Sequence, residues 1–199
     1  MTAPQKMTTQ QALDLGVKHH NAGNLFTAEK IYRKLLQTEP GMTAATHLLG
    51  VISYQKGDYQ TAVELIEQAL SVEPNLAAAH NNLGLALRKL GRSEAALACY
   101  RKAVSINKKY TDAYNNLGNV LRECGHLECA LKNYQKAQYL SPEGTDSTFN
   151  AADMLLQLGR GKEAIQTLKT IKSPRGLLQS QGRILECLYV LGNRDQFYR

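Results

Sequence analysis

Tryptophan is absent from the 199-residue chain, and cysteine is scarce, with four residues. Four cysteines are too few for a disulfide scaffold in a chain this long, and their surroundings are typical of helix interiors, so we expect a reducing cytoplasmic location. No segment holds eighteen consecutive apolar residues, and the first ten residues lack the basic and apolar regions of a secretory signal. The sequence therefore predicts neither secretion nor membrane insertion.

Motifs of catalysis are also missing. The chain has no glycine-rich phosphate loop, metalloprotease helix or nucleophile elbow. Cys124, His126 and Cys129 form a C-x-H-x-x-C cluster, but zinc needs four ligands and other copies of this segment carry leucine, alanine or glutamate at these positions. We therefore predict no catalytic residue, no metal site and no cofactor, and expect that the chain is not an enzyme.

A 34-residue repeat organises the chain. Such a period is the signature of repeat architectures, in which each unit buries its apolar face only by stacking on its neighbours. Five copies in register predict one domain, and 43% hydrophobic residues are enough for its core. Three series of small residues define the period: Gly16, Gly50, Gly84, Gly118 and Ala152; Gly23, Gly57, Gly91, Gly125 and Gly159; Ala28, Ala62, Ala96, Ala130 and Ala164.

Each repeat has the pattern of two helices joined by a tight turn. The first glycine series falls in one helix and the alanine series in the other, where missing side chains let the helix axes approach closely. The second glycine series suits a helix C-terminus that needs a left-handed residue. We predict first helices over 9–22, 43–56, 77–90, 111–124 and 145–158, and second helices over 25–38, 59–72, 93–106, 127–140 and 161–172.

Prolines close three of the second helices, at Pro40, Pro74 and Pro142. Proline cannot donate a backbone hydrogen bond and restricts the residue before it. Lys108 replaces the proline of the third repeat, and Pro174 comes two residues early in the fifth. These two junctions should be less uniform than the others.

The third and fourth repeats carry a recognisable consensus. The segments His80 to Asn107 and Tyr114 to Pro142 resemble the tetratricopeptide repeat, and the resemblance covers about residues 9–175. It implies an all-α, right-handed superhelical solenoid of about five helix-turn-helix repeats plus a partial sixth, with first helices on the concave face. The same segments also resemble the repeats that precede the catalytic region of O-linked N-acetylglucosamine transferases.

The expected organisation has three parts. Residues 1–8 form a flexible N-terminus, and residues 176–199 form a partial sixth repeat or a capping helix whose apolar stretch, 177–191, ends at Gly192. Leu185, Leu188 and Tyr189 lack an obvious cover there, which favours truncation of a longer polypeptide at Arg199 and also allows self-association through this helix. The five repeats between these ends span 9–42, 43–76, 77–110, 111–144 and 145–175.

Asparagines recur along the predicted groove at the repeat interval. An amide offers both a donor and an acceptor, so a row of amides can bind the backbone of an extended peptide. The resemblance to the glycosyltransferase repeats implies the same use, whereas the alternative is that these amides only satisfy neighbouring helices. The candidate groove residues are Asn82, Asn116 and Asn150, with Asn81, Asn115 and Asn119 beside them, and Tyr54, Arg88 and Arg122 one turn further along.

Charge narrows the class of partner. His20 and Lys89 accompany the cationic side of the groove, and Asp112, Asp146 and Asp153 lie towards its other end, so we expect a partner of alternating or acidic character, with a solvated face as the alternative. The lysine and arginine clamp that tetratricopeptide proteins use for chaperone tails is missing. The net charge is +7, but the basic residues that carry it lie mainly in second helices, which argues against nucleic acid: Lys34, Lys102, Lys132, Lys136 and Lys169.

The predicted function is that of an interaction scaffold. Its groove would bind an extended peptide or a helix of a partner protein. The alternative hypothesis is the substrate-recognition region of a larger, glycosyltransferase-like transferase that is truncated at Arg199.

Overall fold

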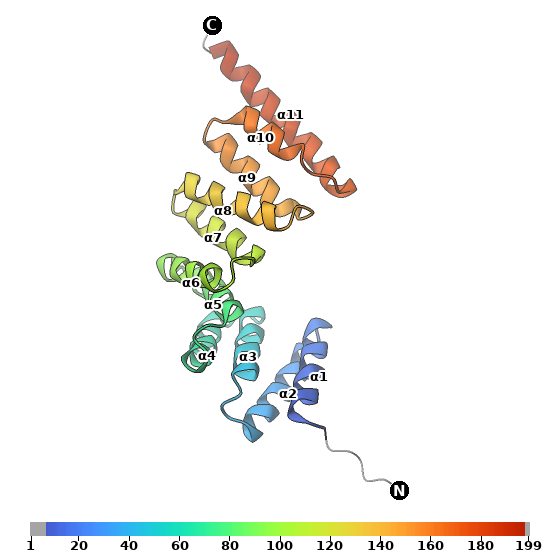
Figure 1. Ribbon diagram of the computed structural model, residues 1–199, viewed down its shortest axis with the longest axis vertical. Coiled ribbons are helices and arrows are strands. Elements are labelled where there is room, and N and C mark those ends of the chain that lie inside the picture. Colours follow the sequence, from blue (N-terminus) through green and yellow to red (C-terminus); the bar gives the residue numbers. More distant parts are fainter. Residues whose placement is uncertain (1–6, 198–199) are drawn as a thin grey trace. The chain divides into compact units, whose positions relative to one another are not determined.

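The computed structural model describes residues 7–197, which form eleven helices and no strand (Figure 1). The all-α class predicted from the sequence is confirmed. Contacts group the chain into two compact units, Met1–Ile106 and Asn107–Arg199, and each is described by itself. Of the flexible N-terminus predicted at 1–8, residues 1–6 lie outside the described residues.

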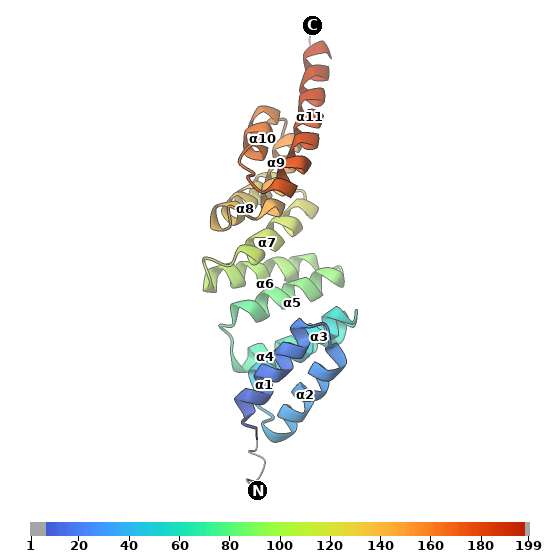
Figure 2. The same ribbon diagram turned by 90° about the vertical axis from the view of Figure 1, so that its right-hand side faces the viewer.

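The first unit consists of three helical hairpins. In each hairpin the first helix packs along the second, and α2 and α4 also contact the first helix of the next hairpin (Figure 2). Since α3 also contacts α5, the first helices of successive repeats lie next to each other. The six helices are α1 (Thr9–Asn21), α2 (Leu25–Thr38), α3 (Thr43–Gln55), α4 (Tyr59–Val72), α5 (Ala77–Lys89) and α6 (Ser93–Ile106).

The second unit contains two further hairpins and a long final helix. α8 contacts α9, which continues the stacking, and α11 contacts both α10 and α9 (Figure 1). The final helix thus lies where the first helix of a following repeat would lie. The five helices are α7 (Thr111–Glu123), α8 (Leu127–Leu140), α9 (Thr145–Gln157), α10 (Gly161–Leu168) and α11 (Pro174–Phe197).

Glycine in a first helix allows close contact with an aromatic ring of the second. A Cβ atom added at Gly84 would lie 2.7 Å from Cε1 of Tyr100, and one added at Gly118 would lie 2.6 Å from the same atom of Tyr134. Real side chains do not approach so closely, so the ring occupies the space that the missing side chain leaves. The alanine series is fully buried beside these rings, and the predicted close approach of the two helices is confirmed.

A left-handed glycine ends the first helix of every repeat. Gly91 has φ +73°, and the amide of the next residue, Arg92, donates to the carbonyl of Leu87 at 2.9 Å. This hydrogen bond closes the helix end in the way that a Schellman motif does. The prediction for the second glycine series is confirmed, because positive φ angles occur at Gly23, Gly57, Gly91, Gly125 and Gly159.

The fifth repeat and the C-terminal helix differ from their predicted boundaries. α10 ends at Leu168 instead of residue 172, because the chain must leave the helix before Pro174, and Thr170 Oγ1 instead donates to the carbonyl of Thr167. α11 begins at Pro174 and runs through Gly192 to Phe197, so the predicted helix end at Gly192 is wrong. Residues 193–197, NRDQF, lack the alanine that anchors a second helix, and a glycine inside a helix costs only about 1 kcal/mol.

Candidate functional site

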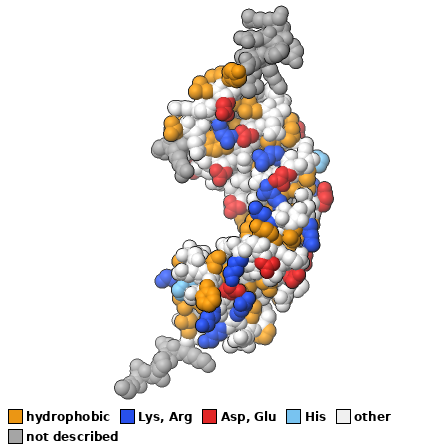
Figure 3. All heavy atoms as spheres, turned by 180° about the vertical axis from the view of Figure 1, so that it is seen from behind, with side chains coloured by type: hydrophobic (Ala, Val, Ile, Leu, Met, Phe, Trp, Pro, Cys, Tyr) orange, Lys and Arg blue, Asp and Glu red, His pale blue; other side chains and the backbone are white. Residues whose placement is uncertain are grey.

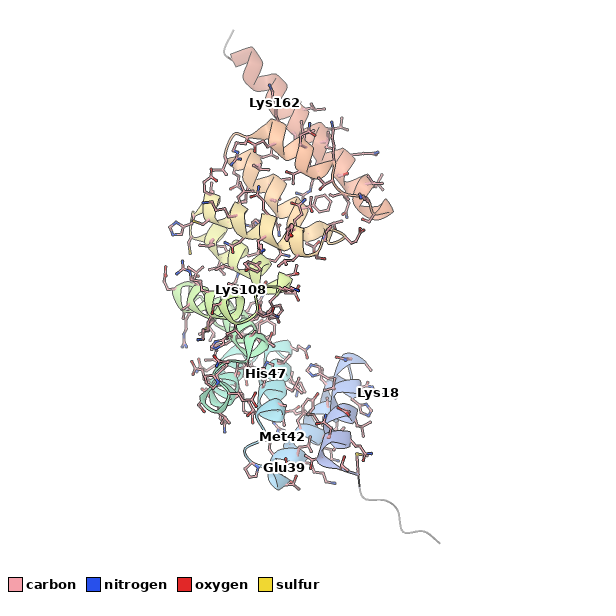
Figure 4. All side chains as sticks on the ribbon, viewed as in Figure 1. Lys18, Glu39, Met42, His47, Lys108 and Lys162 are labelled. Atoms are coloured by element: carbon pink, nitrogen blue, oxygen red, sulfur yellow. The ribbon has the colours of Figure 1, made fainter. Side chains whose placement is uncertain are left out.

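The first helices of the first unit are joined by side-chain hydrogen bonds. Nε2 of His20 on α1 lies 2.8 Å from Oε1 of Gln55 on α3. On the next pair of helices, α3 and α5, Nδ2 of Asn82 lies 3.0 Å from Nε2 of His47. Figure 4 labels His47 on α3. Both contacts join residues 35 positions apart, so the repeat period itself brings them together.

A short chain of hydrogen bonds fixes the orientation of the Asn82 amide. Nδ2 of Asn81 donates to Oδ1 of Asn82 at 3.4 Å, and Nδ2 of Asn82 donates to His47. For Nε2 of His47 to accept, the neutral imidazole must carry its proton on Nδ1. His47 is buried, and burial lowers its pKa, which favours this neutral form.

Tyr54 on α3 lies seven residues beyond His47, and Arg88 on α5 lies six residues beyond Asn82, which is about two turns along each helix. Both are half-buried, and the Tyr54 ring lies 5.5 Å from the Tyr59 ring at a tilt of 54°. Neither α3 nor α5 contains an aspartate or glutamate, and α5 ends in Arg88 and Lys89. The first-helix face of this unit is therefore rich in amides and imidazoles, with positive charge at the end of α5.

The second unit carries the remaining candidate asparagines. Asn115, Asn116 and Asn119 lie on α7 and Asn150 lies on α9, and all four are half-buried. Asn119 has an internal role, since its Oδ1 accepts a hydrogen bond from the Tyr134 hydroxyl at 2.8 Å. Oδ1 of Asn115 is buried and has no hydrogen-bond partner within residues 7–197. Arg122 is half-buried in the last turn of α7.

Asp153, expected towards the acidic end of the groove, instead pairs with α11. Its carboxylate forms a salt bridge with the Arg183 guanidinium. The same guanidinium lies 4.8 Å from the centre of the Phe149 ring, within the range of a cation–π contact. Arg183 therefore anchors α11 to α9 through two contacts, and the Asp153 carboxylate has a cationic partner within its own unit.

Sequence reasoning located the asparagines but missed their partners. His47 occupies the position of Asn81 one repeat earlier, and Arg183 occupies the position of Phe149 one repeat later. The 34-residue interval could therefore have identified His47 and Arg183 as residues of the same first-helix face. Asn82 belongs to the first unit, and Asn116 and Asn150 belong to the second, so a continuous row of amides stays a prediction.

The thiols show no sign of a metal or nucleophilic site in the described part of the chain. All four cysteines are free, and among the described side chains no group of three or more His, Cys, Asp and Glu residues has the geometry to hold a metal ion. Burial, with a smaller effect of Glu67, raises the pKa of the Cys99 thiol to about 11. That thiol is therefore protonated, and unreactive as a nucleophile, at neutral pH.

Family models identify the repeats directly. Two models of the tetratricopeptide repeat match the chain, one over residues 50–91 and 84–123 and the other over residues 111–143. The chain contains tetratricopeptide repeats. A comparison with curated protein sequences gave no significant match. The more specific resemblance to glycosyltransferase repeats stays a prediction, because neither model distinguishes that group.

Solved tetratricopeptide structures share the fold. The chain is 25% identical to the MamA protein, with a TM-score of 0.69 over 81% of this chain and 88% of MamA. It is 22% identical to pilF of Pseudomonas aeruginosa, with a TM-score of 0.79 over 94% and 86% of the two chains. It is 21% identical to YrrB, a tetratricopeptide protein with an unusual peptide-binding site, with a TM-score of 0.68 over 93% and 92%.

The length and apolar character of the helices bear on membrane insertion. None of those over residues 7–197 combines the length and the apolar character that crossing a lipid bilayer requires.

Proposed function

We propose that this tetratricopeptide chain is a protein-interaction scaffold whose first helices bind an extended peptide or a helix of a partner protein. The observation that carries the proposal is the oriented amide of Asn82, held between Asn81 and His47 on the first-helix face. An amide fixed in this way loses little conformational entropy when it binds a peptide group. Each nitrogen and oxygen of Asn82 retains a second hydrogen or lone pair for a ligand.

Charge supports an acidic segment as the ligand of the first unit. α3 and α5 contain no acidic residue, whereas α5 ends in Arg88 and Lys89. YrrB, which shares this fold, has an unusual peptide-binding site, and by analogy this supports a peptide as the ligand. Backbone hydrogen bonds to the asparagines would give affinity, and the cations would select acidic side chains.

Substitution of the three asparagines tests the proposal. Peptides would first be selected from a random library on the wild-type chain, and their affinity for Asn82→Ala/Asn116→Ala/Asn150→Ala would then be measured by calorimetry. We expect a loss of at least about tenfold, which is roughly 1.4 kcal/mol. The matched control is Gln60→Ala/Asn133→Ala/Gln138→Ala, which removes three amides from second helices and should leave affinity unchanged.

Two results of these binding measurements would contradict the proposal. Peptides that bind the triple asparagine variant as tightly as the wild type would exclude the amides from the site. Equal losses in the second-helix control would instead assign binding to the outer face. Circular dichroism of each variant separates both outcomes from unfolding.

We further propose that the scaffold works in a reducing compartment such as the cytoplasm. Four free thiols support this location, since such thiols oxidise readily elsewhere. Alkylation of the exposed Cys129 in intact cells provides the test. A disulfide-blocked Cys129 in freshly lysed cells would contradict the location.

A further inference from the structure

One face of α11 is apolar and exposed. Leu178, Leu185 and Tyr189 are 75%, 67% and 72% exposed, and Leu188 on the same side is about half exposed. Their spacing of seven and then three or four residues places them along one stripe of the helix. Hydrophobic side chains lie at the surface of this C-terminal part of the second unit in Figure 3. A stripe of this size on one helix marks an interaction surface.

The opposite face of α11 already has its partners. Gly176, Ser180 and Cys187 are buried on it, and Arg183 pairs with Asp153 of α9. The first helices α7 and α9 each pack along a second helix, α8 and α10, but no described helix follows α11. Its exposed stripe thus corresponds to the surface that a second helix covers in the repeats before it.

Gly182 forms a gap in the middle of this stripe. A Cβ atom added there would meet nothing within 4 Å, in contrast to Gly84, whose space Tyr100 fills. Leu185 projects from the stripe one turn further along. The face therefore carries both a gap at Gly182 and a projecting side chain at Leu185. A leucine of this kind could fill a gap of this kind on a matching surface.

We propose that the α11 stripe pairs with the α11 stripe of a second copy of this chain, in an antiparallel arrangement. With a twofold axis between residues 183 and 184, Leu185 of each copy lies on Gly182 of the other. Leu178 then lies on Tyr189, beside a recess lined by Leu156, Leu185, Glu186 and Tyr189. A twofold interface of this kind uses the same surface on both copies.

Charge is compatible with the same pairing. Position 181 lies opposite position 186, which brings the Gln181 amide to the Glu186 carboxylate. Arg183, the one cation among the described side chains between 176 and 189, is turned to Asp153 on α9. The stripe therefore opposes no like charges. A contact of about two heptads is at the small end of specific interfaces, so association is expected in the micromolar range.

The mass of the full chain in solution tests the pairing. Sedimentation equilibrium over low to high micromolar concentrations should show a rise from one copy towards two. Leu185→Glu should remain a monomer throughout. The matched control is Val72→Glu on α4, where a similarly exposed aliphatic side chain, 61% exposed, lies outside the stripe. This control should associate like the wild type.

A second pair of variants tests the antiparallel alignment. Gln181→Lys would face Glu186 of the other copy and should tighten association up to about fivefold, as a surface ion pair does. Adding Glu186→Lys should reverse the gain and weaken the pair. A wild-type chain that stays monomeric, a mass beyond two copies, a Leu185→Glu dimer, or no response to Gln181→Lys would each overturn the proposal.

Discussion

The hydroxyl of Tyr134 donates a hydrogen bond to Oδ1 of Asn119, 2.8 Å away, so an asparagine of the first-helix face serves a tyrosine of its own repeat. Tyr32 occupies the same repeat position, but its hydroxyl is buried without a hydrogen-bond partner in the described part of the chain. Burial raises the pKa of Tyr32 to about 12. Tyr134 and Tyr32 thus occupy equivalent repeat positions, but only the Tyr134 hydroxyl has a hydrogen-bond partner among the described residues.

Removing each hydroxyl should have different effects on stability. Tyr134→Phe leaves the Asn119 oxygen without its donor, and we expect the free energy of unfolding to fall by about 1–2 kcal/mol. Tyr32→Phe removes an unpaired group and should change stability by no more than about 0.5 kcal/mol, or raise it. Urea unfolding followed by circular dichroism measures both. Equal losses in the two variants would contradict the assignment.

Two helical glycines should respond oppositely to alanine. Gly84→Ala places a methyl group against the Tyr100 ring and should destabilise the chain by about 1–3 kcal/mol. Gly182→Ala meets no neighbour and gains helix propensity, so stability should rise by up to about 1 kcal/mol. Thermal unfolding at a concentration where the chain is monomeric compares them. A neutral Gly84→Ala would refute close contact as the reason for this glycine series.

His47 should make stability depend on pH. Burial lowers its pKa in the folded chain, so the unfolded chain binds the proton first as the pH falls below about 6.5. The stabilisation from neutral His47 is thus present above that value and is lost on acidification until the folded chain is protonated as well. His47→Gln keeps an acceptor for Asn82 but does not titrate.

Comparing the wild type with His47→Gln isolates the effect of His47 protonation on stability. The wild type should lose more of its melting temperature between pH 7.5 and pH 5.5 than His47→Gln, since every other titrating group is shared. Differential scanning calorimetry at the two pH values gives the difference. Parallel losses would show that protonation of His47 has no influence on the fold.

Arg183 should hold α11 on the second unit. Arg183→Met removes the salt bridge with Asp153 and the contact with Phe149, whereas Asp153→Asn removes only the former. Because the ion pair is partly exposed, each loss should cost less than about 1 kcal/mol. Hydrogen exchange over residues 174–189 should therefore quicken in both variants, and more in Arg183→Met. Faster exchange confined to α7 and α8 would assign Arg183 another role.

The periodic residues made most of the fold predictable. α2, α4, α6 and α8 have the predicted bounds, and the first helices end one residue early, because the residue before each left-handed glycine is the C-cap. Glycine and alanine decide these positions locally, through backbone angles and close packing. The path of α11 through Gly192 was not predictable in this way, since a helix can also continue through a glycine at a cost of about 1 kcal/mol.

The candidate site was predictable only in part. Asn81 and Asn82 could be placed on the first-helix face, but their bond to His47 depends on residue types that differ between repeats. The 34-residue period identifies equivalent positions in successive repeats. It does not predict a hydrogen bond between residue types that occur in only one repeat. The hydrogen bond of Asn119 to Tyr134 was not predictable for the same reason, since Val17 and Leu85 occupy the position of Asn119 in other repeats.

The constant spacing of the left-handed glycines also bears on how the chain can change length. Within each unit, successive repeats meet in the same way, with a second helix packed against the next first helix. Removing 34 consecutive residues, such as 51–84, places Gly50 directly before Leu85, where the equivalent Gly84 stood. Duplicating 34 residues joins equivalent neighbours in the same way. Neither event creates an interface of a new type, so recombination between repeats can shorten or extend this protein in whole steps while each hairpin keeps its packing.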